Sequence, residues 1–82
     1  MPSAFVMRVV VVAPGDRRAY DEDEWRGSIV VVERGEITLE PRAGSSHRFA
    51  PGDVLWLDGL ALLALRNPGR EPAVLVAVAR RG

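Results

Sequence analysis

The chain has 82 residues; its eleven basic side chains balance eleven acidic ones, and it contains no cysteine and one histidine. So short a chain forms one domain with a small core, and its composition excludes disulfides, thiolate metal sites and a metal site built from several histidines of one chain. The densest charged run, at residues 21–24, is acidic, which argues against nucleic acid as a partner because phosphates would be repelled.

Short apolar runs, separated by glycine and proline, follow one another along the chain. Runs of this kind are typical of β-strands joined by tight turns. Strands are expected within residues 5–13, 17–25, 27–33, 36–40, 47–49, 54–57, 60–66 and 73–79. Since no stretch of ten residues combines helix caps with a period of 3.6, the sequence predicts an all-β fold. We expect a single domain over residues 1–82, a small antiparallel barrel or sandwich without substantial helix.

The apolar stretch at the N-terminal end is short, is interrupted by Arg8 and has no basic region before it. It is therefore too short to span a membrane and does not read as a secretion signal. We expect no membrane partner and a cytoplasmic location.

Two predicted strands carry apolar residues on both faces. In residues 60–66 leucine and alanine fill both alternating sets, and in residues 73–79 Val74, Val76 and Val78 alternate with further apolar residues. A strand in a one-domain barrel should present one polar face to water, so the second apolar face needs a cover. The sequence therefore predicts a homodimer, which would also support so small a core.

The spacing of the turn residues resembles the two sequence motifs of the cupin family. The first motif is Gly, five residues, His-x-His, three or four residues, Glu, six residues and Gly, which falls here on Gly15, Asp21, Asp23, Ser28 and Gly35. The second is Gly, five residues, Pro-x-Gly, two residues, His, three residues and Asn, which falls on Gly52, Asp58, Leu60, Leu63 and Asn67. The resemblance covers residues 15–78 and implies a cupin-like (jelly-roll) β-barrel.

The metal ligands of that family do not carry over to this chain. Asp21 and Asp23 stand in place of the two histidines of the first motif, Ser28 in place of its glutamate and Leu63 in place of the last histidine. A shift of one residue would only exchange the two aspartates for their glutamate neighbours. The resemblance therefore implies a barrel without the family's transition-metal centre, and we expect neither a metal nor a cofactor.

Charged candidates for a site are few. On a strand, Asp21 and Asp23 would share one face, and paired carboxylates suit acid/base chemistry or a hard cation. They could also contact a bound ligand, or form only a solvated acidic rim. His47 could act as a general base, or it could be a histidine of a surface loop.

Apolar candidates point to a different kind of site. If Trp56 and Leu63 both point into the barrel, they line an apolar pocket suited to a small aliphatic or aromatic ligand, and Trp25 is a further aromatic candidate for contact with it. The alternative is that these side chains fill the core and leave no room.

These observations favour a metal-free, non-catalytic cupin that binds a small molecule or serves as a dimeric accessory module. The alternative is an isomerase- or cyclase-like cupin enzyme in which Asp21, Asp23 or His47 supplies acid/base chemistry without a transition metal. A site in which oxygen atoms alone hold a cation would need about six of them, and the sequence offers no such set.

Overall fold

The computed structural model describes residues 4–80, so the outermost residues of the domain predicted over 1–82 lie outside that range. Its elements are β1 (Phe5–Val12), β2 (Arg17–Ala19), α1 (Glu22–Trp25), β3 (Ser28–Arg34), β4 (Ile37–Pro41), β5 (His47–Phe49), β6 (Val54–Trp56), β7 (Leu62–Arg66) and β8 (Ala73–Arg80). Each strand overlaps one predicted run, and the prediction of an all-β fold is confirmed. Over this range no helix has the length and apolar character that crossing a membrane would require.

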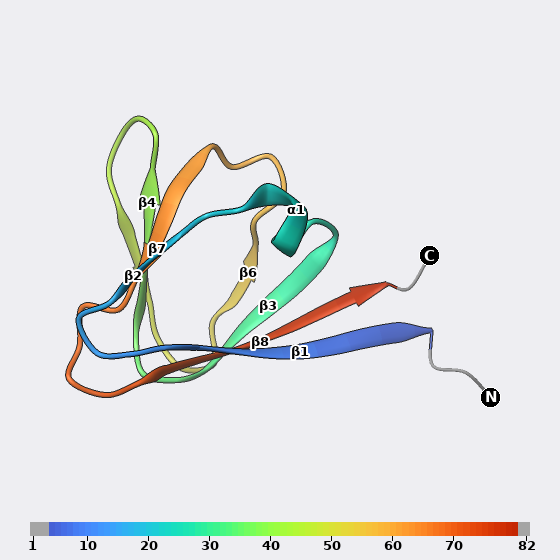
Figure 1. Ribbon diagram of the computed structural model, residues 1–82, viewed down its shortest axis with the longest axis horizontal. Helices are drawn as coiled ribbons and strands as arrows, with labels where there is room; N and C mark the ends of the chain where they lie inside the picture. Colours follow the sequence, from blue (N-terminus) through green and yellow to red (C-terminus); the bar gives the residue numbers. More distant parts are fainter. Residues whose placement is uncertain (1–3, 81–82) are drawn as a thin grey trace.

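The strands form two four-stranded antiparallel sheets that lie face to face (Figure 1). Sheet A has the strand order β1-β8-β3-β6 and sheet B the order β2-β7-β4-β5. The chain passes repeatedly from one sheet to the other, for example from β1 to β2 and from β7 to β8, which is the connectivity of a jelly roll. No strand of sheet A pairs with one of sheet B among the described residues, so the two sheets remain distinct.

The core lies between the sheets and is aliphatic. Alternation along β3 places Val30 and Val32 inward, where both are fully buried, and β8 places Leu75 inward in the same way. Sheet B contributes Ile37 and Leu65 from the opposite side. Since full burial of one such side chain stabilises the fold by roughly 1.5–3 kcal/mol, these inward rows fix which face of each strand is hidden.

The segment between β2 and β3 forms a single helical turn, α1, at the top of the gap between the sheets in Figure 1. Asp21 caps this turn, because its carboxylate accepts a hydrogen bond of 3.0 Å from the backbone N–H of Asp23. Asp21 itself is extended, but Asp23 lies within the helical turn, so the expectation that the two aspartates share one face of a strand is wrong. Trp25 ends the turn and is fully buried, so its ring anchors α1 in the core.

Asn67, the asparagine of the second motif, holds the opposite end of the fold together. It is fully buried, and its Nδ2 donates to the carbonyl oxygens of Val12 at 3.0 Å and Glu71 at 2.7 Å. Its Oδ1 accepts a hydrogen bond of 2.9 Å from the N–H of Gly69. One side chain thus joins the end of β1 to the connection between β7 and β8.

Gly35 makes the turn from β3 to β4 fit against the start of β8. Its φ is +70°, in the left-handed region that favours glycine. A Cβ at this position would lie 2.5 Å from the carbonyl oxygen of Pro72. The glycine of the first motif is therefore required by close backbone approach as well as by conformation.

Candidate ligand-binding site

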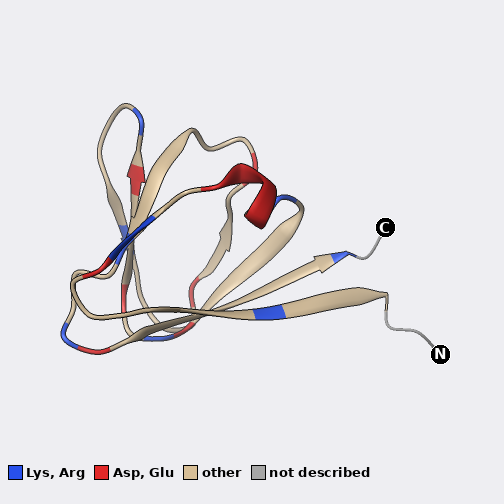
Figure 2. Cartoon of the chain, viewed as in Figure 1, with Lys and Arg blue, Asp and Glu red and all other residues tan. Residues whose placement is uncertain are grey.

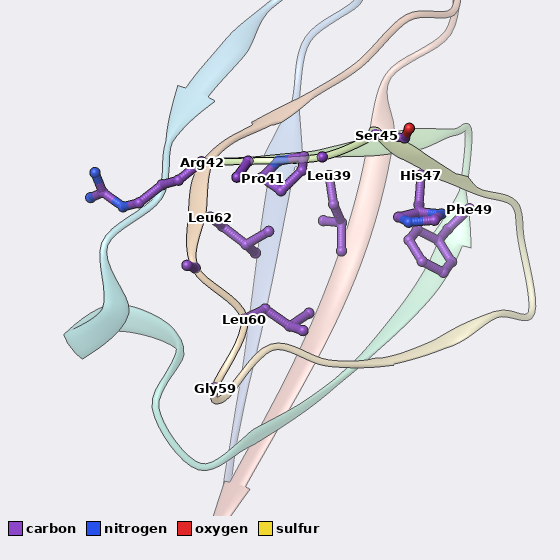
Figure 3. Close-up of a pocket in the computed structure, with 12 residues that line it drawn as sticks. Leu39, Pro41, Arg42, Ser45, His47, Phe49, Gly59, Leu60 and Leu62 are labelled. Carbon is purple, nitrogen blue, oxygen red and sulfur yellow. The ribbon is translucent and has the colours of Figure 1, made fainter.

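A cavity of about 480 Å³ opens between β4, β5 and the segment that leads into β7 (Figure 3). Its walls are mainly apolar and include Leu39 and Pro41 of β4, Phe49 of β5, and Leu60 and Leu62. Mostly apolar walls around roughly 300–1,000 Å³, with a few polar groups among them, are typical of small-molecule sites. This cavity is the candidate site of the protein.

Among the polar side chains that line the cavity, the imidazole of His47 lies on the same side as the apolar walls. His47 and Phe49 lie two apart on β5 and share one face, and Figure 3 shows both rings on the same side as Leu39. Arg42 also belongs to the lining, but its side chain extends away from the rings in the same view. The imidazole can donate and accept hydrogen bonds, so it can orient one polar group of a ligand. His47 lies on strand β5 and not in a loop, but it is exposed, so the alternative of a surface histidine is wrong only about the loop.

The leucine at the cavity is Leu62 rather than the predicted Leu63. Pairing between β4 and β7 shifts, because Glu40 pairs with Ala64 whereas the next residue, Pro41, pairs with Leu62. The irregularity adds one residue to β7, which changes the direction of the side chains that precede it. Leu62 is 5% exposed and packs in the core, whereas Leu63 is 44% exposed and does not line the cavity. The inward orientation expected for Leu63 is therefore wrong.

Neither tryptophan lines the cavity. On and next to β6, Leu55 and Leu57 take the inward positions and are buried, which leaves Trp56 on the outer face with 53% of its surface exposed. The inward orientation predicted for Trp56 is therefore wrong. Trp25 is fully buried and fills the core, as the alternative reading of the aromatic residues allowed.

The two aspartates of the acidic run have local partners instead of a shared ligand. Asp21 caps α1, and the carboxylate of Asp23 pairs with the guanidinium of Arg26 at 2.8 Å. Both aspartates are exposed, and neither lines the cavity. They therefore do not form a paired acid/base site.

Glu24 of the same run turns inward and forms an ion-pair cluster. Its carboxylate pairs with Arg18 of β2 and, at 3.2 Å, with Arg8 of β1, whose guanidinium lies 4.9 Å from the ring centre of Trp25. Burial alone would raise the pKa of Glu24, but hydrogen bonds and charges from Arg18 and then Arg8 outweigh it and hold the pKa below its ordinary value. The cluster ties α1 to one strand of each sheet. The pattern Asp-x-x-Glu at 21–24, a helix-start signal, could have predicted the turn.

The residues aligned with the family's metal ligands do not fit a metal centre. The carboxylates of Asp21 and Asp23 are engaged in the cap and the ion pair, Ser28 is a buried hydroxyl and Leu63 offers no donor. Between residues 4 and 80, no three His, Cys, Asp or Glu side chains gather in a way that could hold a metal ion. The transition-metal chemistry of the family has no ligand set in this part of the chain.

A smaller cavity of about 210 Å³ adjoins the first and shares Leu60 and Leu62 with it. Tyr20 lines this space, and its hydroxyl is buried without a hydrogen-bond partner within the described range. Burial, followed by the negative charges of Glu22 and Asp58, raises the pKa of Tyr20 above its ordinary value. The phenol therefore stays a neutral donor that a water molecule or a polar ligand group could satisfy.

Comparison with solved structures places this architecture among known folds. A cupin 2 conserved barrel domain protein from Salinispora arenicola CNS-205 matches with a TM-score of 0.68 and 26% identity, over 95% of this chain and 68% of that one. Ectoine synthase from P. lautus matches with a TM-score of 0.66 and 23% identity, over 92% of this chain and 52% of that one. The cupin 2 domain of an XRE family transcriptional regulator from Enterobacter cloacae matches with a TM-score of 0.63 and 19% identity, over 98% of this chain and 99% of that domain.

No protein-family model matches the sequence, and no curated protein matches it either. The fold and the cavity together define a small antiparallel jelly roll with an apolar cavity that opens beside β4 and β5. The family is indicated by the motif glycines, by the role of Asn67 and by the likeness to cupin barrels. The chain belongs to the cupin superfamily. It spans about half the length of the ectoine synthase chain that it matches.

Proposed function

We propose that this cupin binds a small, mainly apolar molecule in the cavity beside His47, without a metal ion. The cavity of about 480 Å³ is the observation that carries the proposal. Leu39, Phe49 and Leu62 offer apolar surface for affinity, and the imidazole offers one point of polar recognition. The lack of a cluster of metal-ligating side chains in residues 4–80 supports binding without a metal. That binding takes place in the cytoplasm stays a prediction from the sequence.

His47 favours one alternative function, that of an isomerase- or cyclase-like enzyme. An imidazole that faces a ligand cavity can move a proton to or from a bound molecule, which is the usual task of a catalytic histidine. The aspartates 21 and 23 lie outside the cavity lining, so the acid/base role of this alternative falls to His47. The fold does not choose between the two functions, since its likenesses include ectoine synthase and a domain of a transcriptional regulator.

A cavity-blocking variant tests ligand binding directly. Ala61 is exposed and lines the cavity, so Ala61→Trp should fill the entrance without disturbing the core. Ala50 is an exposed alanine that follows Phe49 but does not line the cavity, and it provides the matched control Ala50→Trp. Indole, phenol and cyclohexanecarboxylate serve as probes, and ¹H–¹⁵N NMR spectra report binding.

We expect at least one probe to shift the amide signals of Leu39, Phe49 and Leu62 in the wild type and in Ala50→Trp. The same shifts should be lost in Ala61→Trp. Absence of shifts at these residues with every probe, or equal shifts in the blocked variant, would contradict the proposed site.

A second variant, His47→Gln, separates binding from catalysis. Glutamine keeps hydrogen-bonding capacity but cannot act as an acid or base near neutral pH. A binding module should keep its affinity for a bound probe within a few fold, whereas an enzyme should lose about 10²–10⁴-fold in kcat towards its substrate with little change in KM. Any turnover that survives this change in full rules out the catalytic role of His47.

A further inference from the structure

The outer face of sheet A, on the side away from the core, is apolar across all four strands. Its strongly exposed side chains are Met7, Val9, Val11, Ile29, Val54 and Trp56. Half-buried valines fill the places between them, at positions 31, 74, 76 and 78. These side chains together are named the apolar face of sheet A.

Strand pairing makes this face continuous. One row across β1, β8, β3 and β6 consists of Met7, Val78, Ile29 and Trp56. The next row consists of Val9, Val76, Val31 and Val54. Because directly paired residues have Cβ atoms about 4.5–5.5 Å apart, the side chains of each row touch and leave no polar gap.

Charged residues are absent from the middle of this surface. In Figure 2 the strands of sheet A are tan over most of their length, and charges gather on α1, in the loops and at strand ends. Arg8, the charged residue within β1, turns to the opposite face of the sheet, where it pairs with Glu24. Among residues 4–80, basic groups lie only at the two ends of the face, where Arg80 pairs with Phe5 and Arg34 pairs with Val74. Two separated arginines are fewer than the clusters of about 4–8 basic residues that recognise an anionic lipid surface, and they form no continuous basic patch for a nucleic acid.

The extent of this surface matches half of a stable protein interface. Its strongly exposed members have between 48% and 70% of their surface accessible, which leaves roughly 700 Å² of apolar area uncovered. The largest apolar patch on a typical monomer covers only about 300–600 Å². A standard protein–protein interface takes about 800 Å² from each partner. An apolar area of this size, with its charges confined to its ends, can pack against a second copy of itself.

We propose that a second copy of this chain covers the apolar face of sheet A, with the two sheets packed face to face about a two-fold axis. Sheets with twisted strands pack in this way with their strand directions about 30° apart, and a two-fold axis lets one patch serve both partners. The homodimer was predicted from residues 60–66 and 73–79, and of these runs only the second contributes to the face. The cavity lies in the other sheet and would stay open in the dimer.

A pair of matched substitutions tests the interface. Ile29 on β3 is 48% exposed within the face, and Leu63 on β7 is 44% exposed on the other sheet, so both are exposed aliphatic residues of central strands. Sedimentation velocity at micromolar concentration measures the assembly of the wild type, Ile29→Lys and Leu63→Lys. Acrylamide quenching of tryptophan fluorescence adds a local readout, because Trp56 lies in the face whereas Trp25 is buried in either state.

We expect the wild type and Leu63→Lys to sediment as dimers of about 18 kDa, twice the 9.0 kDa chain. In Ile29→Lys the dissociation constant should rise by about 100-fold or more, since each dimer would bury two unpaired ammonium groups in an apolar interface, and quenching should increase. If Ile29→Lys does not fold, Trp56→Lys on the edge strand should produce the same dissociation.

A wild-type monomer at micromolar concentration would overturn the proposal. So would a folded Ile29→Lys or Trp56→Lys protein that remains as dimeric as the wild type. Binding of the wild type to phosphatidylcholine vesicles, with no dimer in solution, would show that lipid rather than a second copy covers the face, and would also refute the proposal.

Discussion

Removal of the Asn67 side chain should weaken this fold more than any other single change of a polar residue. The substitution Asn67→Ala leaves the carbonyl oxygen of Val12, the carbonyl oxygen of Glu71 and the N–H of Gly69 without their partners. Each buried group left unsatisfied costs about 1–3 kcal/mol, although the two partners nearer the surface can regain water. The expected loss in free energy of unfolding is therefore about 3–4 kcal/mol. A chain of this size has a total stability of roughly 4–12 kcal/mol, so the loss is a large share of it.

Urea denaturation followed by circular dichroism measures this loss, at one fixed protein concentration because dimerisation would add to the apparent stability. The same change should lower Tm by about 15–30 °C. Thr38→Val is the control. Thr38 is 5% exposed, and its hydroxyl has no hydrogen-bond partner within residues 4–80. Removal of this hydroxyl should therefore change the free energy of unfolding by less than about 1 kcal/mol. A loss below about 1 kcal/mol for Asn67→Ala, or an equal loss for both variants, would refute the reasoning.

Two further changes test the anchoring of α1 and the turn after β3. The pKa of Glu24 is lowered in the folded state, so its ion pairs stabilise the protein above the unfolded pKa of about 4.3 and the stabilisation is lost as pH falls through the lower folded value. Glu24→Gln should therefore lower the free energy of unfolding by roughly 1–2 kcal/mol at pH 7, between the values for exposed and fully buried ion pairs. It should also make acid denaturation below about pH 4.3 shallower. An unchanged acid transition would show that Arg18 does not hold this carboxylate. Gly35→Ala should lower the free energy of unfolding, measured by urea denaturation, by about 3 kcal/mol or more because its Cβ would meet Pro72. Gly44→Ala is the control: its φ is +87° and nothing lies within 4 Å, so it should cost only about 1 kcal/mol of backbone strain. Similar losses for the two variants would contradict the close approach at Gly35.

The strands could be predicted from the sequence because their signals are local. Alternation along residues 36–40 and the glycines of the turns depend on near neighbours, and so do the motif spacings that indicated a cupin. The same spacing singled out Asn67 as a turn residue, although its buried hydrogen bonds were not predicted. These features needed no knowledge of which strands meet.

The site could not be predicted in the same way, because it depends on pairing between distant strands. On β6 both alternating sets are apolar, so the pattern alone could not decide that Leu55 faces inward and Trp56 outward. The extra residue in β7 exchanged Leu63 for Leu62 at the cavity, and such irregularities leave no mark in the order of apolar residues. His47 acquired its place only when β5 paired with β4.

The position of β8 in sheet A has a consequence for how the chain reaches its fold. This strand is the last along the described chain, yet it lies between β1 and β3 and pairs with both. During synthesis, β1 therefore has no neighbour in its sheet until residues 73–80 have left the ribosome, and the core lacks Ala73, Leu75 and Ala77 until then. Pairing of the first strand with the last also demands closure of a very long loop, which is slow for β topologies. Folding of this domain is thus delayed until β8 has been translated and has left the ribosome, and a chain cut short before β8 would expose apolar strands prone to aggregation.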